Sequence, residues 1–202
     1  MNYAAFFSYI FLTAFSPGPN NIMSMANASK HGFVKGLPFI IGILIGTFIV
    51  VGLGAAFTSL LVDLIPKIEP FLLCGSAAYI LWLAWSVWRD KPKSKGKHSL
   101  ETNSIPSGMI LQFINVKLVF YGLSSLSAFV LPFYKGFPEL FPFVILITLV
   151  GFASVCSWSV FGVVFESLFT KHKKITNAIL ALALVYCAAS QLISMFSGLL
   201  TT

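Results

Sequence analysis

The sequence predicts an all-α membrane protein with six transmembrane helices, and three observations lead to this fold class. Hydrophobic residues make up 57% of the 202 residues and charged residues only 9%, a balance typical of multi-pass membrane proteins. The apolar residues gather in six stretches, each near the roughly 20 residues that a spanning helix needs. The loops between them are short, so we expect a single transmembrane domain over residues 1–202. The six stretches are about 3–26, 36–61, 68–88, 107–131, 139–165 and 174–198.

The first stretch contains the motif Ser16-Pro17-Gly18-Pro19-Asn20-Asn21, which predicts a broken first helix. Each proline lacks an N–H and clashes with the carbonyl four residues earlier, which frees the carbonyls of Thr13 and Phe15. In a membrane, such freed groups persist only where protein or a water-filled cavity satisfies them. A broken helix at this depth therefore favours a binding site.

The second and third stretches carry packing and interface signals. Gly42-x-x-x-Gly46 is a spacing of small residues that lets two helices approach closely. We interpret it as packing within one chain, and a homodimer contact is the alternative. Trp85 and Trp88 end the third stretch beside Arg89, which suits an aromatic belt at the cytoplasmic surface.

A basic segment from Arg89 to Glu101 separates two halves of three stretches each. Its Lys, Ser, Gly and Pro residues are typical of a solvated linker. An odd number of spans per half gives the halves opposite orientations, as in the inverted repeats of many secondary transporters. We therefore expect a 3+3 inverted repeat, with pseudo-repeats at about 1–90 and 105–202 joined by a basic cytoplasmic linker.

The net charge of +7 is explained by topology and does not require nucleic acid as a partner. Only Lys67 and Lys135 lie on the side that follows the second and fourth stretches. The other side is cytoplasmic by the positive-inside rule, which places both termini outside. Its basic residues are Lys30, Lys35, Arg89, Lys91, Lys93, Lys95, Lys97, Lys171, Lys173 and Lys174.

Lys117 lies deep in the fourth stretch, two residues after Asn115. A lysine at such depth costs on the order of 3 kcal/mol on an insertion scale. Its side chain reaches the membrane surface only from positions near a helix end. We therefore expect a functional role for Lys117.

The remaining titratable residues argue against several classes of protein. The carboxylates and histidines all fall in loops or near the ends of the stretches, which disfavours a proton pump, a carboxylate cation filter and a zinc protease. The three cysteines form no C-x-x-C pair, so we expect neither a metal site nor a cofactor. An intramembrane enzyme is a distant alternative, because Ser16, Ser124 and Ser125 coexist with Lys117 as conceivable nucleophiles.

Four segments, 16–21, 29–33, 75–85 and 111–117, make the chain resemble the LysE/RhtB family of amino-acid exporters. Weaker similarity continues through 155–158 and 184–188, so the resemblance covers nearly the whole chain. The wider family has Asn-Pro-Lys in the fourth span, where this chain has Val116. The subgroup that exports cysteine and O-acetylserine is similar in having valine there. Because a valine keeps its N–H, it need not kink the helix.

The resemblance implies export of small amino acids from the cytoplasm across a bacterial inner membrane. The helix that restarts near Pro19 exposes N–H groups that bind carboxylates, and Lys117 adds a positive charge. The carbonyls of Thr13 and Phe15, with the amides of Asn20, Asn21 and Asn115, are expected to accept hydrogen bonds from the substrate ammonium. The candidate substrate-binding residues are Ser16, Pro17, Gly18, Pro19, Asn20, Asn21, Asn115, Lys117 and Tyr121.

The absence of an acidic residue at this depth favours neutral cargo over lysine or arginine. Cysteine, O-acetylserine and similar amino acids fit, and a homoserine or threonine exporter is the alternative. Two energy sources remain open. Proton antiport would have to use Lys117, whereas facilitated diffusion through a carrier or channel would need only accumulation of substrate in the cytoplasm.

Overall fold

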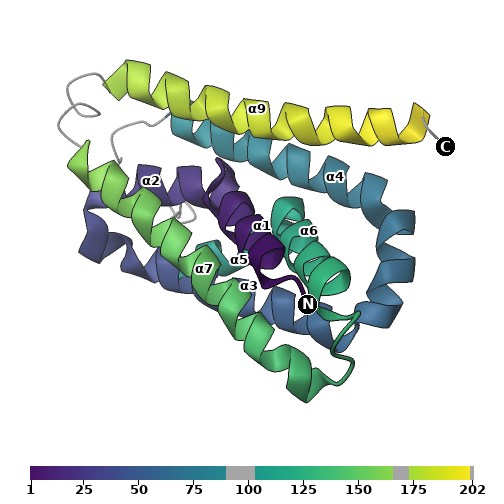
Figure 1. Ribbon diagram of the computed structural model, residues 1–202. Coiled ribbons are helices and arrows are strands. Elements are labelled where there is room, and N and C mark those ends of the chain that lie inside the picture. The colour runs from purple at the N-terminus through teal and green to yellow at the C-terminus, as the bar shows by residue number, and fades with distance from the viewer. Residues whose placement is uncertain (90–102, 166–172, 201–202) are drawn as a thin grey trace.

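The computed structural model describes residues 1–89, 103–165 and 173–200, and in these ranges the chain is helical apart from short turns (Figure 1). The expected all-α fold is confirmed there, while most of the basic linker and segment 166–172 lie outside the described residues. In chain order the helices are α1 (Tyr3–Phe15), α2 (Pro19–His31), α3 (Phe33–Ala56), α4 (Thr58–Trp88), α5 (Ile105–Ile114), α6 (Val116–Ser124), η1 (Ser125–Val130), α7 (Phe137–Val164) and α9 (Lys173–Leu200).

The first predicted span is broken where the prolines lie, as expected. Helix α1 ends at Phe15, and the next residue, Ser16, is extended with ψ 148°. Helix α2 begins at Pro19, where a missing N–H is harmless because the first turn of a helix leaves its N–H groups unbonded. The broken first helix is thus confirmed.

The fourth predicted span is also broken, although it contains no proline. Helix α5 ends at Ile114 and α6 begins at Val116, with Asn115 between them at φ −79° and ψ 93°. That ψ is far from the helical value near −42°. The segments on either side, Ile105–Ile114 and Val116–Val130, are bent by 67° relative to each other. The residue type at Val116 did not reveal this break.

The boundary between the second and third predicted spans differs from the sequence prediction. The chain turns at Phe57, and α4 then runs without interruption from Thr58 to Trp88. The expected loop between 61 and 68 is therefore helical. Charged residues do not by themselves end a helix, because the polar side of a helix accommodates them.

Within the described residues, two helices are long and apolar enough to cross a membrane alone, namely α3 and α7. The bent pair of α5 with α6 and η1 makes a third candidate if it counts as one span. The shorter apolar helices are Tyr3–Phe15, Leu73–Trp88 and Lys174–Ser190. Leu12, Leu149 and Leu182 are 75%, 52% and 63% exposed, as expected of side chains that face lipid.

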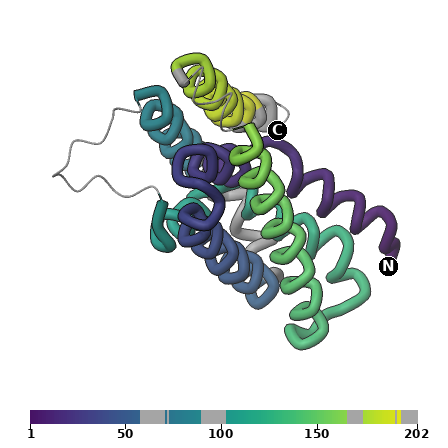
Figure 2. Tube along the Cα trace, turned by 90° about the vertical axis from the view of Figure 1, so that its left-hand side faces the viewer, coloured from purple at the N-terminus to yellow at the C-terminus, as the bar shows by residue number. Residues whose placement is uncertain are grey.

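The two halves of the chain contact each other in a reciprocal pattern. Helix α2 packs on α7, and α5 packs on α3, so the broken helix of each half meets the long apolar helix of the other. Helix α3 also packs on α7, and the two lie side by side in Figure 2. Helices α4 and α9 form the remaining close pair, at the top of Figure 1.

Glycines make the contact between α3 and α5 unusually close. A methyl group added at Gly42 would collide with the carbonyl of Ile105, and one added at Gly108 would collide with the carbonyl of Phe39. Gly46 faces Gln112, whose Cγ would be 2.7 Å from an added methyl. The Gly42-x-x-x-Gly46 motif is therefore used inside the chain, where backbone lies against backbone.

Two apolar clusters flank the centre of the molecule. One includes Ile43 and Leu184, and the other includes Phe6 and Leu118. Ile43 and Leu118 both border the cavity described below. The cavity thus lies between the two apolar clusters.

Substituting Gly42→Ala should lower the midpoint of thermal unfolding, because the new methyl meets the Ile105 backbone and overpacking costs about 1–3 kcal/mol. The midpoint is measured by size exclusion after heating the detergent-purified protein. Gly75→Ala is the matched control, since nothing lies within 4 Å of its added methyl. Equal midpoints for the two variants would show that α3 and α5 do not pack this closely.

Candidate functional site

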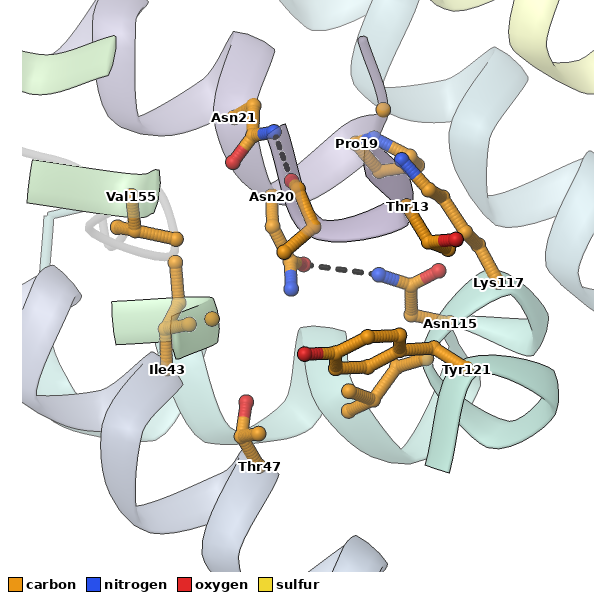
Figure 3. A pocket seen from close by; sticks show the side chains of 14 residues that line it. Thr13, Pro19, Asn20, Asn21, Ile43, Thr47, Asn115, Lys117, Tyr121 and Val155 are labelled. Carbon is orange, nitrogen blue, oxygen red and sulfur yellow. Dashed lines mark hydrogen bonds between the residues drawn. The ribbon is translucent and has the colours of Figure 1, made fainter. Parts of the chain in front are cut away.

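A cavity with polar and apolar lining residues lies where the two helix breaks meet, and its volume is about 40 Å³. Figure 3 shows Asn20 and Asn115 facing each other, with Lys117 on one side and Thr47 on another. The site therefore combines residues from both halves of the chain. Its lining residues are Thr13, Ala14, Gly18, Pro19, Asn20, Asn21, Ile43, Thr47, Asn115, Lys117, Leu118, Tyr121, Gly151 and Val155.

Lys117 stands in the first turn of α6, and its side chain reaches the broken end of α1. The ammonium nitrogen Nζ donates to Ser16 Oγ at 2.8 Å, to the Ser16 carbonyl at 3.0 Å and to the Pro17 carbonyl at 3.3 Å. A positive charge is unfavourable at the N-terminus of its own helix but favourable at the C-terminus of another. The lysine thus connects the two breaks.

Side chains from α2 and α7 satisfy the other carbonyls at the end of α1. Asn21 Nδ2 donates to the carbonyls of Ala14 and Ser16 at 2.8 and 2.9 Å. Ser154 Oγ donates to the Ala14 carbonyl at 2.8 Å, and Trp158 Nε1 donates to the Phe15 carbonyl at 3.2 Å. Because buried carbonyls need partners, these contacts are what make the break tolerable.

The carbonyls of Thr13 and Phe15, which we expected to receive the substrate ammonium, already accept hydrogen bonds from the protein. Ser16 Oγ donates to the Thr13 carbonyl at 2.8 Å, and Trp158 holds that of Phe15. The freed backbone of α1 therefore serves internal contacts in this structure. The carboxamide groups are the better source of an acceptor for a ligand.

Two helices begin at the cavity without a capping side chain. Gly18 precedes α2, and Asn115 precedes α6, and neither helix start receives a hydrogen bond from a capping side chain. The first N–H groups of a helix carry partial positive charge and bind anions. Gly18 leaves room for Lys117, whose Nζ would lie 2.9 Å from an added methyl. The α2 start and the lysine together make this wall of the cavity electropositive.

Three carboxamides and a hydroxyl form a hydrogen-bonded group next to the α2 start. Asn20 and Gln112 exchange two hydrogen bonds, of 2.7 and 3.1 Å. Asn115 Nδ2 donates to Asn20 Oδ1 at 2.9 Å, and Thr47 Oγ1 lies 3.4 Å from Gln112 Oε1. Gln112 is fully buried, so this group is fixed from inside the protein.

The nine residues predicted for the site lie together, although not all of them border the cavity. Gly18, Pro19, Asn20, Asn21, Asn115, Lys117 and Tyr121 line it. Ser16 and Pro17 lie behind Lys117 and hold its ammonium group. The Tyr121 hydroxyl donates to the Ile147 carbonyl of α7 at 3.2 Å, which fixes the ring against the cavity.

Sequence reasoning did not place Gln112, Ser154 and Trp158 in the site, yet each carries a detectable signal. Gln112 precedes Asn115 by three residues, a spacing that brings polar side chains to neighbouring positions on a helix. Ser154 and Trp158 are four residues apart on α7, which places both on the face that meets α1. Polar residues at helical spacing in an apolar stretch were the available clue.

Within the described residues, no group of three or more His, Cys, Asp or Glu side chains could hold a metal ion. The cavity lining itself contains none of these four residue types. The arrangement can bind a small molecule that carries an anionic group and hydrogen-bond donors. Ser16 Oγ lies 2.8 Å from Lys117 Nζ, and Ser16 itself does not line the cavity.

Comparison with known proteins gives a consistent family match. The model of the LysE type translocator family matches residues 11–195. Proteins named cysteine/O-acetylserine efflux protein, from Escherichia coli K12 and Shigella flexneri serotype 5b, are each 37% identical over 186 residues. These matches cover 92% of this chain and 94% of each relative. No solved structure matches the chain.

Substituting Ser154→Ala should destabilise the protein by about 1 kcal/mol, because the hydroxyl that holds the Ala14 carbonyl is lost. Ser159→Ala is the matched control, since this buried serine of α7 bonds only to Val155 of its own helix. Thermal unfolding of both variants in detergent measures the difference. A larger loss for the control would contradict the assigned role of Ser154.

Proposed function

We propose that this chain, which belongs to the LysE type translocator family, is a secondary transporter that exports small neutral amino acids from the cytoplasm. The observation that carries the proposal is the cavity between the two helix breaks, with its electropositive wall and its wall of carboxamides. A zwitterion has one group suited to each wall. Unwound helices at a transporter midplane commonly serve this purpose.

The carboxylate of the substrate binds at the start of α2 in this proposal. The N–H groups of Asn20 and Asn21 lie in the first turn of that helix, which has no capping side chain, and such a helix start attracts anions. Lys117 adds a full charge on the same wall and is already held beside Gly18. The ammonium of the substrate then faces the carboxamides.

The proposed cargo is a small, neutral amino acid such as cysteine or O-acetylserine. The curated relatives are named for efflux of these two compounds. The lining residues include no carboxylate that would neutralise a cationic side chain, so lysine and arginine are disfavoured. Homoserine and threonine have similar size and polarity, and they are the alternative cargo.

Export requires the cavity to open toward each side of the membrane in turn. Alternating access, in which the two halves rock around a central site, supplies such a movement.

We further propose six spans arranged as a 3+3 inverted repeat in the bacterial inner membrane, with both termini in the periplasm. The order of a broken helix, a long apolar helix and a third helix occurs once as α1–α2, α3, α4 and again as α5–α6, α7, α9. The reciprocal contacts of α2 with α7 and α5 with α3 support the same repeat. The distribution of basic residues supports the orientation.

The proposal predicts export of neutral amino acids by purified protein in lipid vesicles. Cysteine or O-acetylserine should leave the vesicles faster than lysine, because the site has no acid to pair with a second cation. Release of each preloaded amino acid is measured against vesicles that lack protein. Preferential release of lysine would contradict the cargo assignment, and release of homoserine or threonine alone would favour the alternative.

The same vesicles separate the two energy sources. If protons drive transport, a pH gradient imposed in one direction should speed cysteine release severalfold. A gradient imposed in the opposite direction should slow it. Equal rates with and without the gradient would leave facilitated diffusion as the mechanism.

Substituting Lys117→Met should reduce export at least about tenfold, because hydrogen bonds to a charged group contribute roughly 1.5–3 kcal/mol. Lys135→Met is the matched control, since that lysine lies between η1 and α7 and uses only its backbone N–H to bind Glu139. Export from cells with equal membrane levels of each variant measures the effect. Normal export by the Lys117 variant would remove the lysine from the mechanism.

A further inference from the structure

We propose that Gln112 fixes the direction of a chain of amide hydrogen bonds, and that the chain ends on Asn115 Oδ1 as the acceptor for the substrate ammonium. This inference rests on the proposed export function and specifies how the amino group is recognised. It makes Gln112 a positioning residue, because Gln112 acts on the ligand through Asn20 and Asn115.

The chain begins at the backbone carbonyl of Gly108. Gln112 Nε2 donates to that carbonyl at 3.1 Å. A carbonyl can only accept, so the nitrogen of the Gln112 carboxamide must be on this side. Reversing the carboxamide would bring two oxygen atoms together. The backbone of α5 therefore decides which end of Gln112 is the donor.

The orientation passes from Gln112 to Asn20. Gln112 Oε1 accepts from Asn20 Nδ2 at 2.7 Å, and Gln112 Nε2 donates to Asn20 Oδ1 at 3.1 Å. Both bonds require Asn20 to match the orientation already set. Asn20 Oδ1 is then placed as an acceptor toward the second break.

The orientation passes once more, from Asn20 to Asn115. Asn115 Nδ2 donates to Asn20 Oδ1 at 2.9 Å, so Asn115 Oδ1 must point away from Asn20. Figure 3 shows this oxygen turned toward the side on which Thr13 and Lys117 lie. Asn115 is 3% exposed, and its Oδ1 has no hydrogen-bond partner among the residues that the structure describes.

A buried acceptor without a partner is costly, and a donor from a ligand relieves that cost. An ammonium group has three donors and no acceptor, so it suits an oxygen that nothing else holds. The helix start of α2 borders the same cavity and attracts the carboxylate. The carboxylate is thereby assigned to the start of α2, and the ammonium to the Asn115 carboxamide.

The test compares two ligands that differ only in the amino group, cysteine and 3-mercaptopropionate, under reducing conditions. Calorimetry on purified protein in detergent should give cysteine an affinity about ten- to a hundredfold higher, as one hydrogen bond to a charged group implies. In Asn115→Leu this ratio should fall to about threefold or less, while the affinity for 3-mercaptopropionate stays within about threefold of the original.

Gln112→Leu should also lower the ratio, although Asn115 is intact, because Asn20 and Asn115 lose their fixed orientation. This variant applies even if Asn115→Leu cannot be purified. Ser159→Ala, on the neighbouring α7, should leave the ratio unchanged, because its hydroxyl bonds only to its own helix.

A wild-type ratio near one, or an unchanged ratio in Asn115→Leu or in Gln112→Leu, would overturn the assignment. The proposed function fails in a different way, namely if the wild-type protein binds neither ligand and releases no amino acid from vesicles. If the protein binds and exports cysteine but the affinity ratio is unchanged in these variants, the proposed function holds. In that case this mode of recognising the amino group is wrong.

Discussion

The fold depends on how the carbonyl groups at the end of α1 find partners inside the protein. Five consecutive carbonyls, from Thr13 to Pro17, accept hydrogen bonds from side chains of the α1–α2 connection, α2, α6 and α7. In an apolar environment each unsatisfied carbonyl would cost several kcal/mol. The break therefore cannot exist unless the other half of the chain is folded against it, and the contacts that satisfy it also form one side of the cavity.

This dependence explains why a lysine is tolerated at such depth. The charge of Lys117 is unfavourable in apolar surroundings, but its three donors meet three oxygen atoms at the negative end of α1. The broken helix and the buried charge each offset the cost of the other. Their separation by about 100 residues along the sequence makes the pairing a tertiary contact, so neither motif can be understood from local propensity.

The sequence was informative where the physics is local and less so where partners come from another helix. Two prolines predicted the first break, because a missing N–H and a steric clash act within one turn. The second break at Asn115 has no such cause, since Val116 can continue a helix. It instead accompanies contacts that Lys117 and the Asn115 carboxamide make with the first half. Gln112 was missed for the same reason, because its role depends on Asn20.

The close contact of α3 with α5 determines how the molecule can move. Where backbone lies directly against backbone at Gly42 and Gly108, neither helix can rotate or slide without a collision, so the two behave as one rigid body. Helix α6 also packs on α3, and along the chain it is joined to α5 through Asn115. Any opening of the cavity that swings α6 must then be absorbed by the backbone angles of that residue. Asn115 is thus both the hinge of the second half and a residue that lines the cavity. A change at Asn115 therefore affects the opening of the cavity and the binding of its ligand together.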